Sequence, residues 1–70
     1  MNSENIGKRI KDIRLEHGLS QQKLGELLAV SQDTISLWER GKSIPTTEFL
    51  ISIATQFDVS VDYILCLKDY

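Results

Sequence analysis

The sequence predicts an all-α fold, a compact bundle of five short helices. Apolar side chains recur at intervals of three and four residues, the spacing that places them on one face of a helix. A serine or threonine precedes each apolar stretch, and glycine follows two of them, as expected of residues that begin and end helices. The β-branched residues follow the same helical spacing and do not alternate with polar ones, so no strand is predicted.

The first helix is predicted over residues 4–16. Ser3 is its expected N-cap, and Gly18 lies just beyond its last residue. Three isoleucines at helical spacing form its buried face: Ile6, Ile10 and Ile13.

The next two helices are short, with Ser20 and Ser31 as their expected N-caps and Gly41 as the stop after the second of them. Their predicted inward-facing residues are Leu24 and Leu28, then Ile35 and Trp38. At this spacing Trp38 is interpreted as a core aromatic and not as a base-stacking one.

The last two helices follow Pro45, which favours an extended approach to a helix that begins at Thr46 or Thr47. Ser60 is the expected N-cap of the fifth helix. The apolar stripes of these two helices are Leu50, Ile53, Ala54 and Phe57, then Val61, Ile64 and Leu65.

Composition excludes several classes of protein. Seventy residues make one domain, too small for a cofactor-binding enzyme with a deep cleft, so no enzymatic activity and no cofactor are predicted. A single cysteine, Cys66, and a single histidine, His17, argue against a disulfide and a metal site. No apolar run approaches the roughly 18 residues of a membrane span, and no signal peptide opens the chain, so a cytoplasmic location is expected.

Residues 20–41 carry the main functional prediction. Two short helices joined by a tight turn form the layout of a DNA-binding helix-turn-helix, whose second helix enters the major groove. Gly25 is expected where the backbones of the two helices approach closely. The turn is expected to need a positive φ, which glycine or asparagine would adopt more readily than Ala29.

The exposed ridge of the third helix is the predicted reading surface, because Ile35 and Trp38 face inward. The expected base-reading residues are Gln32, Asp33, Ser36 and Leu37. A glutamine amide pairs with adenine, an aspartate accepts from N4 of cytosine, and an apolar side chain contacts the thymine methyl group.

Phosphate contacts are expected at both ends of this segment. Gln21 and Ser31 open helices whose free N–H groups suit an anion, and Arg40, Lys42 and Ser43 follow the reading ridge.

The net charge of −2 opposes DNA binding, but its distribution is uneven. Residues 1–45 hold seven basic and six acidic side chains, whereas residues 46–70 hold one basic and four acidic ones. The acidic excess therefore lies away from the reading segment. Affinity for random DNA is expected to be weak.

Residues 6–65 resemble the Cro/C1-type helix-turn-helix family of phage repressors and related bacterial regulators, with the motif at residues 21–40 and short extensions at 1–5 and 66–70. The resemblance is carried by residues 14–21, 34–36, 38–41, 45, 50, 53, 54 and 59–62. It implies that Gln21 contacts a phosphate, that Gln32, Asp33 and Leu37 read bases, and that Arg14 pairs with Glu39 as structural support. Four residues depart from the family pattern: Ala29 and Asp58, where glycine is common, Thr47, where an apolar residue is usual, and Leu37, where a polar residue is usual.

Four large side chains lie off the apolar stripes: Phe49, Tyr63, Leu67 and Tyr70. They are either scattered surface residues or a patch for a second copy, because proteins of this family commonly dimerise through their fourth and fifth helices. A two-fold homodimer would require a palindromic operator with half-sites about 34 Å apart.

The sequence therefore predicts a sequence-specific regulator that binds double-stranded DNA, acting as a repressor by occupying an operator as a dimer. One alternative is a protein-interaction module, such as an antitoxin or adaptor with weak DNA binding. Another is a controller protein of a restriction-modification system.

Overall fold

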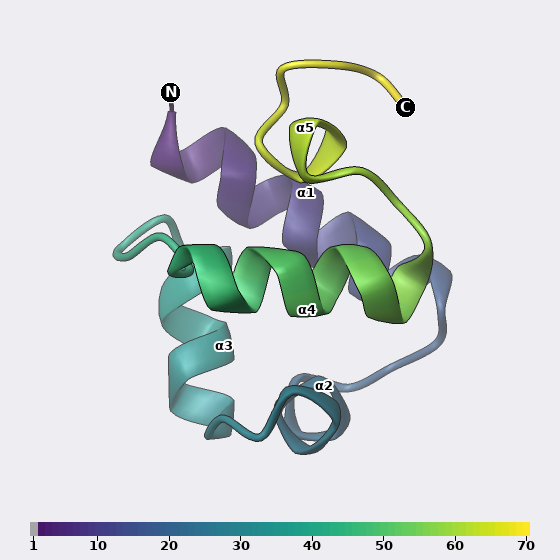
Figure 1. The fold of residues 1–70 in the computed structure, drawn as a ribbon. Coiled ribbons are helices and arrows are strands. Elements are labelled where there is room, and N and C mark those ends of the chain that lie inside the picture. The colour runs from purple at the N-terminus through teal and green to yellow at the C-terminus, as the bar shows by residue number, and fades with distance from the viewer. Residues whose placement is uncertain (1) are drawn as a thin grey trace.

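Five α-helices form the chain in a computed structural model that describes residues 2–70; Met1, part of the expected N-terminal extension, lies outside the described residues. The helices are α1 (Ser3–Glu16), α2 (Gln21–Leu28), α3 (Gln32–Glu39), α4 (Thr47–Phe57) and α5 (Val61–Ile64) (Figure 1). No strand occurs within residues 2–70. The predicted all-α bundle is confirmed.

The serine caps form as predicted for three helices. The hydroxyl oxygens of Ser20, Ser31 and Ser60 each accept a hydrogen bond from the backbone N–H three residues later. The prediction for α1 was wrong by one residue. Asn2, and not Ser3, is its N-cap, since the Asn2 side chain accepts from the N–H of Asn5 at 3.1 Å. An asparagine caps as well as a serine, so starting one residue earlier costs nothing in capping.

Pro45 and two residues of positive φ lie in the connections between helices. Pro45 is buried and precedes α4, whose N-cap Thr46 makes no side-chain hydrogen bond to the helix. Ala29 and Asp58 end α2 and α4 in the left-handed region, with φ of 60° and 53°. This conformation confirms the positive φ expected at Ala29, and aspartate tolerates it better than most residues.

Every helix contributes to the core, which is mainly aliphatic and includes two aromatic residues. Its buried apolar residues are Ile6, Ile10, Ile13, Leu24, Leu28, Ile35, Trp38, Leu50, Ile53, Phe57 and Ile64. Trp38 is 4% exposed, which confirms it as a core residue. In α5 only Ile64 is fully buried, and its expected neighbours Val61 and Leu65 are half-buried against the same cluster.

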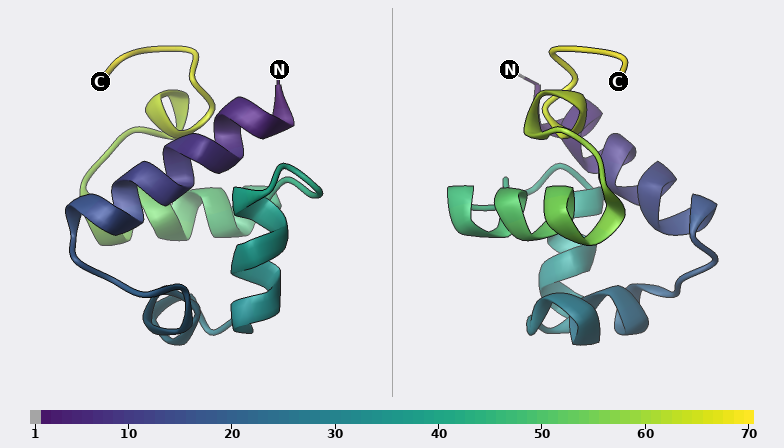
Figure 2. Two further views of the ribbon diagram at one scale, coloured as in Figure 1. Left: turned by 180° about the vertical axis from the view of Figure 1, so that it is seen from behind. Right: turned by 45° about the vertical axis from the view of Figure 1, so that its right-hand side comes forward.

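Helix α1 runs behind α4 and contacts both α3 and α5, while α2 lies across the opposite end of the molecule from α5 (Figures 1 and 2). The C-terminal segment curls beside α5 and the start of α1 (Figure 2). Among the described helices, none combines the length and the apolar character that crossing a membrane requires.

Candidate nucleic-acid interface

The connection between α2 and α3 is a tight reversal that depends on Gly25. A Cβ at this position would lie 2.6 Å from the carbonyl oxygen of Val30, closer than real side chains approach backbone. The backbone N–H of Val30 donates to the carbonyl of Gly25 at 2.9 Å. The close approach predicted at Gly25 is therefore confirmed, although the neighbour is the turn itself.

Helix α3 divides into a buried face and an exposed ridge. Ile35 and Trp38 are 0% and 4% exposed and fix the helix on the core. Gln32 and Asp33, in its first turn, are exposed, and Leu37 is 40% exposed one turn later. The ridge expected to read bases therefore faces solvent, with a large apolar side chain in its centre.

Ser36 is held differently from the other residues of the ridge. It is half-buried, and the Nε of Arg40 donates to both its carbonyl oxygen at 3.3 Å and its hydroxyl oxygen at 3.1 Å. The guanidinium of Arg40 therefore lies back along α3, and the Ser36 hydroxyl keeps its own proton for donation.

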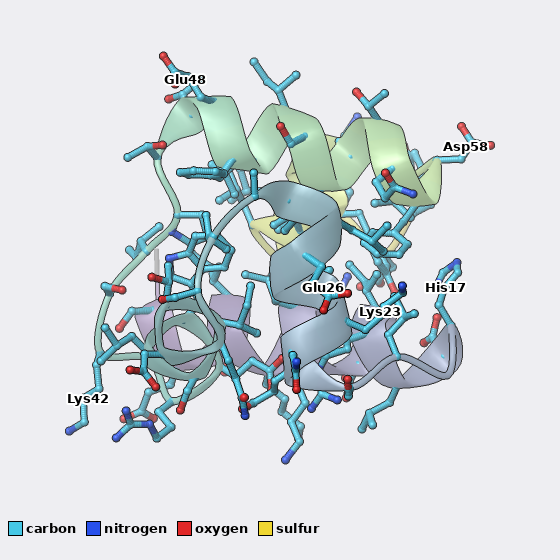
Figure 3. All side chains as sticks on the ribbon, turned by 90° about the horizontal axis from the view of Figure 1, so that it is seen from below. His17, Lys23, Glu26, Lys42, Glu48 and Asp58 are labelled. Atoms are coloured by element: carbon cyan, nitrogen blue, oxygen red, sulfur yellow. The ribbon has the colours of Figure 1, made fainter. Side chains whose placement is uncertain are left out.

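The expected phosphate-contacting residues lie at opposite ends of the helix pair and do not form one cluster. Ser31 already accepts from the N–H of Thr34 at 3.2 Å, and its hydroxyl lies 3.0 Å from that of Thr34. Lys42 and Ser43 are exposed in the connection after α3, where Lys42 projects from the body at the lower left of Figure 3.

An ion pair clamps α3 to α1. Arg14 donates from Nε to Oε2 of Glu39 at 2.7 Å and from Nη2 to Oε1 at 3.0 Å, and its Nη1 donates to the carbonyl of Leu19 at 2.8 Å. The side chains of Arg14 and Glu39 are only 9% and 3% exposed. The pair that the family resemblance implies thus forms, and it is buried and bidentate, the stronger class of charge-assisted contact.

Gln21 joins the same cluster from the first residue of α2. Its Nε2 donates to Oε1 of Glu39 at 3.1 Å, so one carboxylate accepts hydrogen bonds from α1 and α2 while it sits at the end of α3. This contact fixes the amide of Gln21 and leaves one of its two protons free. The position of the candidate phosphate-binding residue is therefore coupled to that of α3.

Sequence reasoning missed Gly7, where α1 crosses the end of α3. A Cβ on Gly7 would lie 2.1 Å from the carbonyl oxygen of Trp38 and 2.9 Å from that of Glu39. The available signal was a lone glycine inside an otherwise strong helical pattern, which indicates close packing.

Two acidic residues of the C-terminal half lie away from Lys42. The acidic residues Glu48 and Asp58 lie at the two ends of α4, along the upper edge of Figure 3, and Lys42 projects from the lower edge. Glu48 and Asp58 therefore lie away from Lys42.

The four residues proposed as a dimer patch have different surroundings. Phe49 is half-buried with its ring centroid 5.5 Å from that of Trp38, and Tyr63 is half-buried beneath the guanidinium of Arg9. Leu67 and Tyr70 are 61% and 77% exposed. Of the four residues, only Leu67 and Tyr70 offer a large apolar surface without a rearrangement of side chains.

Comparison with known proteins agrees with this architecture. A family model described as helix-turn-helix matches residues 10–64. The HTH-type transcriptional regulator ImmR of Bacillus subtilis is 33% identical over 60 residues, which make up 86% of this chain and 47% of ImmR. Repressor protein C2 of Salmonella phage P22 is 35% identical over 65 residues, covering 93% of this chain and 30% of the repressor. The antitoxin PezA of Streptococcus pneumoniae is 36% identical over 55 residues, covering 79% and 35%.

Two similar solved structures contain DNA. The P22 c2 repressor in complex with a synthetic operator superposes with a TM-score of 0.79 at 34% identity, covering 84% of this chain and 89% of that chain. The biofilm regulator SinR in complex with DNA gives 0.78 at 38% identity, covering 86% and 97%. The chain spans less than half the length of the three curated relatives named above.

Proposed function

The chain belongs to the Cro/C1-type helix-turn-helix family, and from this membership we propose that it is a transcription regulator that binds double-stranded DNA sequence-specifically. The observation that supports this most directly is the exposed ridge of α3, which stands on a helix whose buried face is fixed by the core and by the Arg14–Glu39 clamp. The function requires no chemistry, cofactor or metal. Because phage and bacterial operators lie in the cytoplasm, that is the proposed compartment.

Recognition is proposed to occur in the major groove. Gln32 presents an amide that pairs with adenine, and Asp33 presents a carboxylate that accepts from N4 of cytosine. Leu37, 40% exposed, provides an apolar contact for a thymine methyl group. Ser36 contributes its remaining hydroxyl proton.

The backbone contacts are proposed to come from both ends of the motif. The N-terminal turns of α2 and α3, at Gln21 and Ser31, suit phosphates because their first N–H groups have no intrahelical partner. The exposed residues after α3 complete the set: Arg40, Lys42 and Ser43. Arg40 must leave Ser36 to reach a phosphate, so the two residues exchange a mutual contact for contacts with DNA.

We infer that the regulator acts as a repressor by occupying a palindromic operator as a homodimer. Leu67 and Tyr70 supply exposed apolar surface at the C-terminal end of the fold, and Tyr63 and Phe49 are partly buried against the core. A single domain of this size makes few phosphate contacts, so two copies raise specific affinity. The P22 c2 repressor structure contains operator DNA, which supports an operator as the partner.

A second candidate is a protein-interaction module. The exposed Leu37, the acidic residues Glu48 and Asp58 at the two ends of α4, and the similarity to the antitoxin PezA favour it. The two functions differ in their response to salt. Binding to phosphates weakens steeply from low to moderate ionic strength, because counterions are released, whereas an apolar interface is nearly insensitive.

The test is selection of ligands from a randomised pool of duplex DNA at low and at moderate salt, using folded protein. An enriched inverted repeat with half-sites about one helical turn apart supports a dimeric operator-binding regulator. A single enriched half-site supports DNA binding but contradicts the dimer. No enrichment at either salt contradicts the proposed function and favours the interaction module.

A further inference from the structure

Arg9, on α1, reaches across to α5 and is held there at two places. Its Nη1 donates to the carbonyl oxygen of Tyr63 at 2.9 Å, and its guanidinium carbon lies 4.0 Å from the centroid of the Tyr63 ring. A planar guanidinium that stacks on a ring and bonds to the backbone of the same residue has a fixed orientation, which a lysine cannot reproduce.

Arg9 holds a C-terminal segment, residues 60–70, which we call the arm. The arm is weakly supported by itself. Helix α5 spans only Val61–Ile64, a length that is unstable in isolation, and the residues after it form no further helix within the described chain. Ser60 links the two ends of this segment, because its hydroxyl donates to the carbonyl of Tyr70 at 2.8 Å. The arm therefore folds on itself, and its position depends on what attaches it to the rest of the domain.

Two side-chain hydrogen bonds attach the arm to α1 within residues 2–70. One is the charge-assisted bond from Arg9 to Tyr63, and the other is a weak bond from the Cys66 thiol to the carbonyl of Asn5 at 3.4 Å. The buried side chain of Ile64 supplies the main apolar part of the attachment, and Val61, Tyr63 and Leu65 are half-buried against the same core. Arg9 is thus the main polar tether of the arm.

We propose that Arg9 is a positioning residue that fixes α5 and residues 65–70 on α1, and thereby sets where the surface for a second copy lies relative to α3. The consequence for DNA rests on the proposed dimer. This role in fixing the arm distinguishes Arg9 from Lys8 and Lys11, its basic neighbours on α1. A contact between Arg9 and a phosphate would require both of its contacts with Tyr63 to break.

The first test measures how often the arm opens, using the chain's one cysteine as the reporter. The rate at which Cys66 reacts with a disulfide reagent of the Ellman type is compared between wild type, Arg9→Gln, Arg9→Lys and the control Lys11→Gln, which makes the same charge change on an exposed residue of α1. We expect a rise of roughly tenfold for Arg9→Gln from the loss of the charged bond and the stacking contact. The rate for Arg9→Lys falls between those of Arg9→Gln and wild type, and the rate for Lys11→Gln matches wild type. An unchanged rate for Arg9→Gln overturns the proposal.

The second test separates opening of the arm from general loss of stability. The backbone N–H groups of Cys66 and Leu67 donate to the carbonyls of Tyr63 and Asp62, and that of Arg40 donates to Ser36 in α3. In Arg9→Gln, hydrogen exchange accelerates at Cys66 and Leu67 and stays unchanged at Arg40. Equal acceleration at all three contradicts a local tether.

The third test concerns DNA and uses a single half-site beside the full operator obtained by selection. Arg9→Gln keeps the wild-type affinity and salt slope on the half-site and loses affinity on the full operator. A weaker half-site complex with a slope reduced by about one assigns Arg9 to a phosphate and overturns the proposal. If wild type binds no DNA, the proposed function fails, while labelling and exchange still decide whether Arg9 is the tether.

Discussion

Replacing Glu39 with glutamine tests whether the clamp between α1, α2 and α3 stabilises the fold. The carboxylate accepts three hydrogen bonds, two from Arg14 and one from Gln21. A glutamine has one acceptor oxygen and one NH₂ group. Whichever way it is oriented, the NH₂ group faces a donor: Nε of Arg14 in one orientation, and both Nη2 of Arg14 and Gln21 in the other.

The cost follows from burial. The Arg14 side chain is 9% exposed, and in the variant its charge retains no carboxylate partner, only the carbonyl of Leu19 and one amide oxygen. Removing one partner of a buried pair costs about 3–5 kcal/mol, and we expect the lower end because the shape is preserved. For a domain of this length, about 3 kcal/mol lowers the melting temperature by roughly 20 °C.

The assay is urea unfolding followed by the fluorescence of Trp38, which is buried next to Glu39. Glu26→Gln is the matched control. Glu26 pairs with Lys23 at 3.6 Å, but both side chains are more than half exposed, so its removal changes stability by less than about 0.5 kcal/mol. If the free energies of unfolding of Glu39→Gln and Glu26→Gln differ by less than about 1 kcal/mol, the clamp does not stabilise the fold as argued.

Three further predictions concern packing, the turn and the reading surface. Gly7→Ala places a Cβ 2.1 Å from the carbonyl of Trp38, so overpacking outweighs the helix propensity gained, and thermal unfolding should show a loss of about 2 kcal/mol; an unchanged midpoint contradicts the close crossing. Ala29→Gly relieves a φ of 60° and should raise stability by about 0.5 kcal/mol in the same measurement, with a loss arguing against strain in the turn. Gln32→Ala should weaken operator binding by roughly 1–3 kcal/mol and leave non-specific binding nearly intact, whereas Lys42→Ala should weaken both and reduce the salt slope, as measured by fluorescence anisotropy. Equal losses for Gln32→Ala on both kinds of DNA contradict its assignment to a base.

Much of the fold could be predicted because its determinants are local. The caps Ser20, Ser31 and Ser60 each bond to a backbone N–H only three residues away, and the need for a positive φ at Ala29 follows from the length of the turn. The error at the start of α1 has the same origin. Asn2 and Ser3 are adjacent and both cap well, so the sequence does not decide between them.

What could not be predicted depends on residues far apart in the chain. Arg9 lies 54 residues from Tyr63, and nothing in the spacing of either residue indicates the other. The burial of Arg14 and Glu39 is likewise a property of the assembled helices, although a resemblance to a family implied that they pair. Phe49 was expected at the surface because it lies off the stripe of α4, but it packs on Trp38 from the neighbouring helix.

The contacts made by Gly7, Arg9 and Arg14 share one element, α1. Gly7 lets it approach the end of α3, and Arg14 joins it there to Glu39. Arg9, on the same helix, holds the arm that carries Leu67 and Tyr70. A single rigid helix therefore connects the ridge proposed to read bases with the surface proposed to meet a second copy. Arg9 bonds to the backbone of Tyr63, and Arg14 binds Glu39 through two hydrogen bonds. Helix α1 therefore sets the distance between the ridge and the surface. A fixed half-site spacing in an operator would require such a fixed distance.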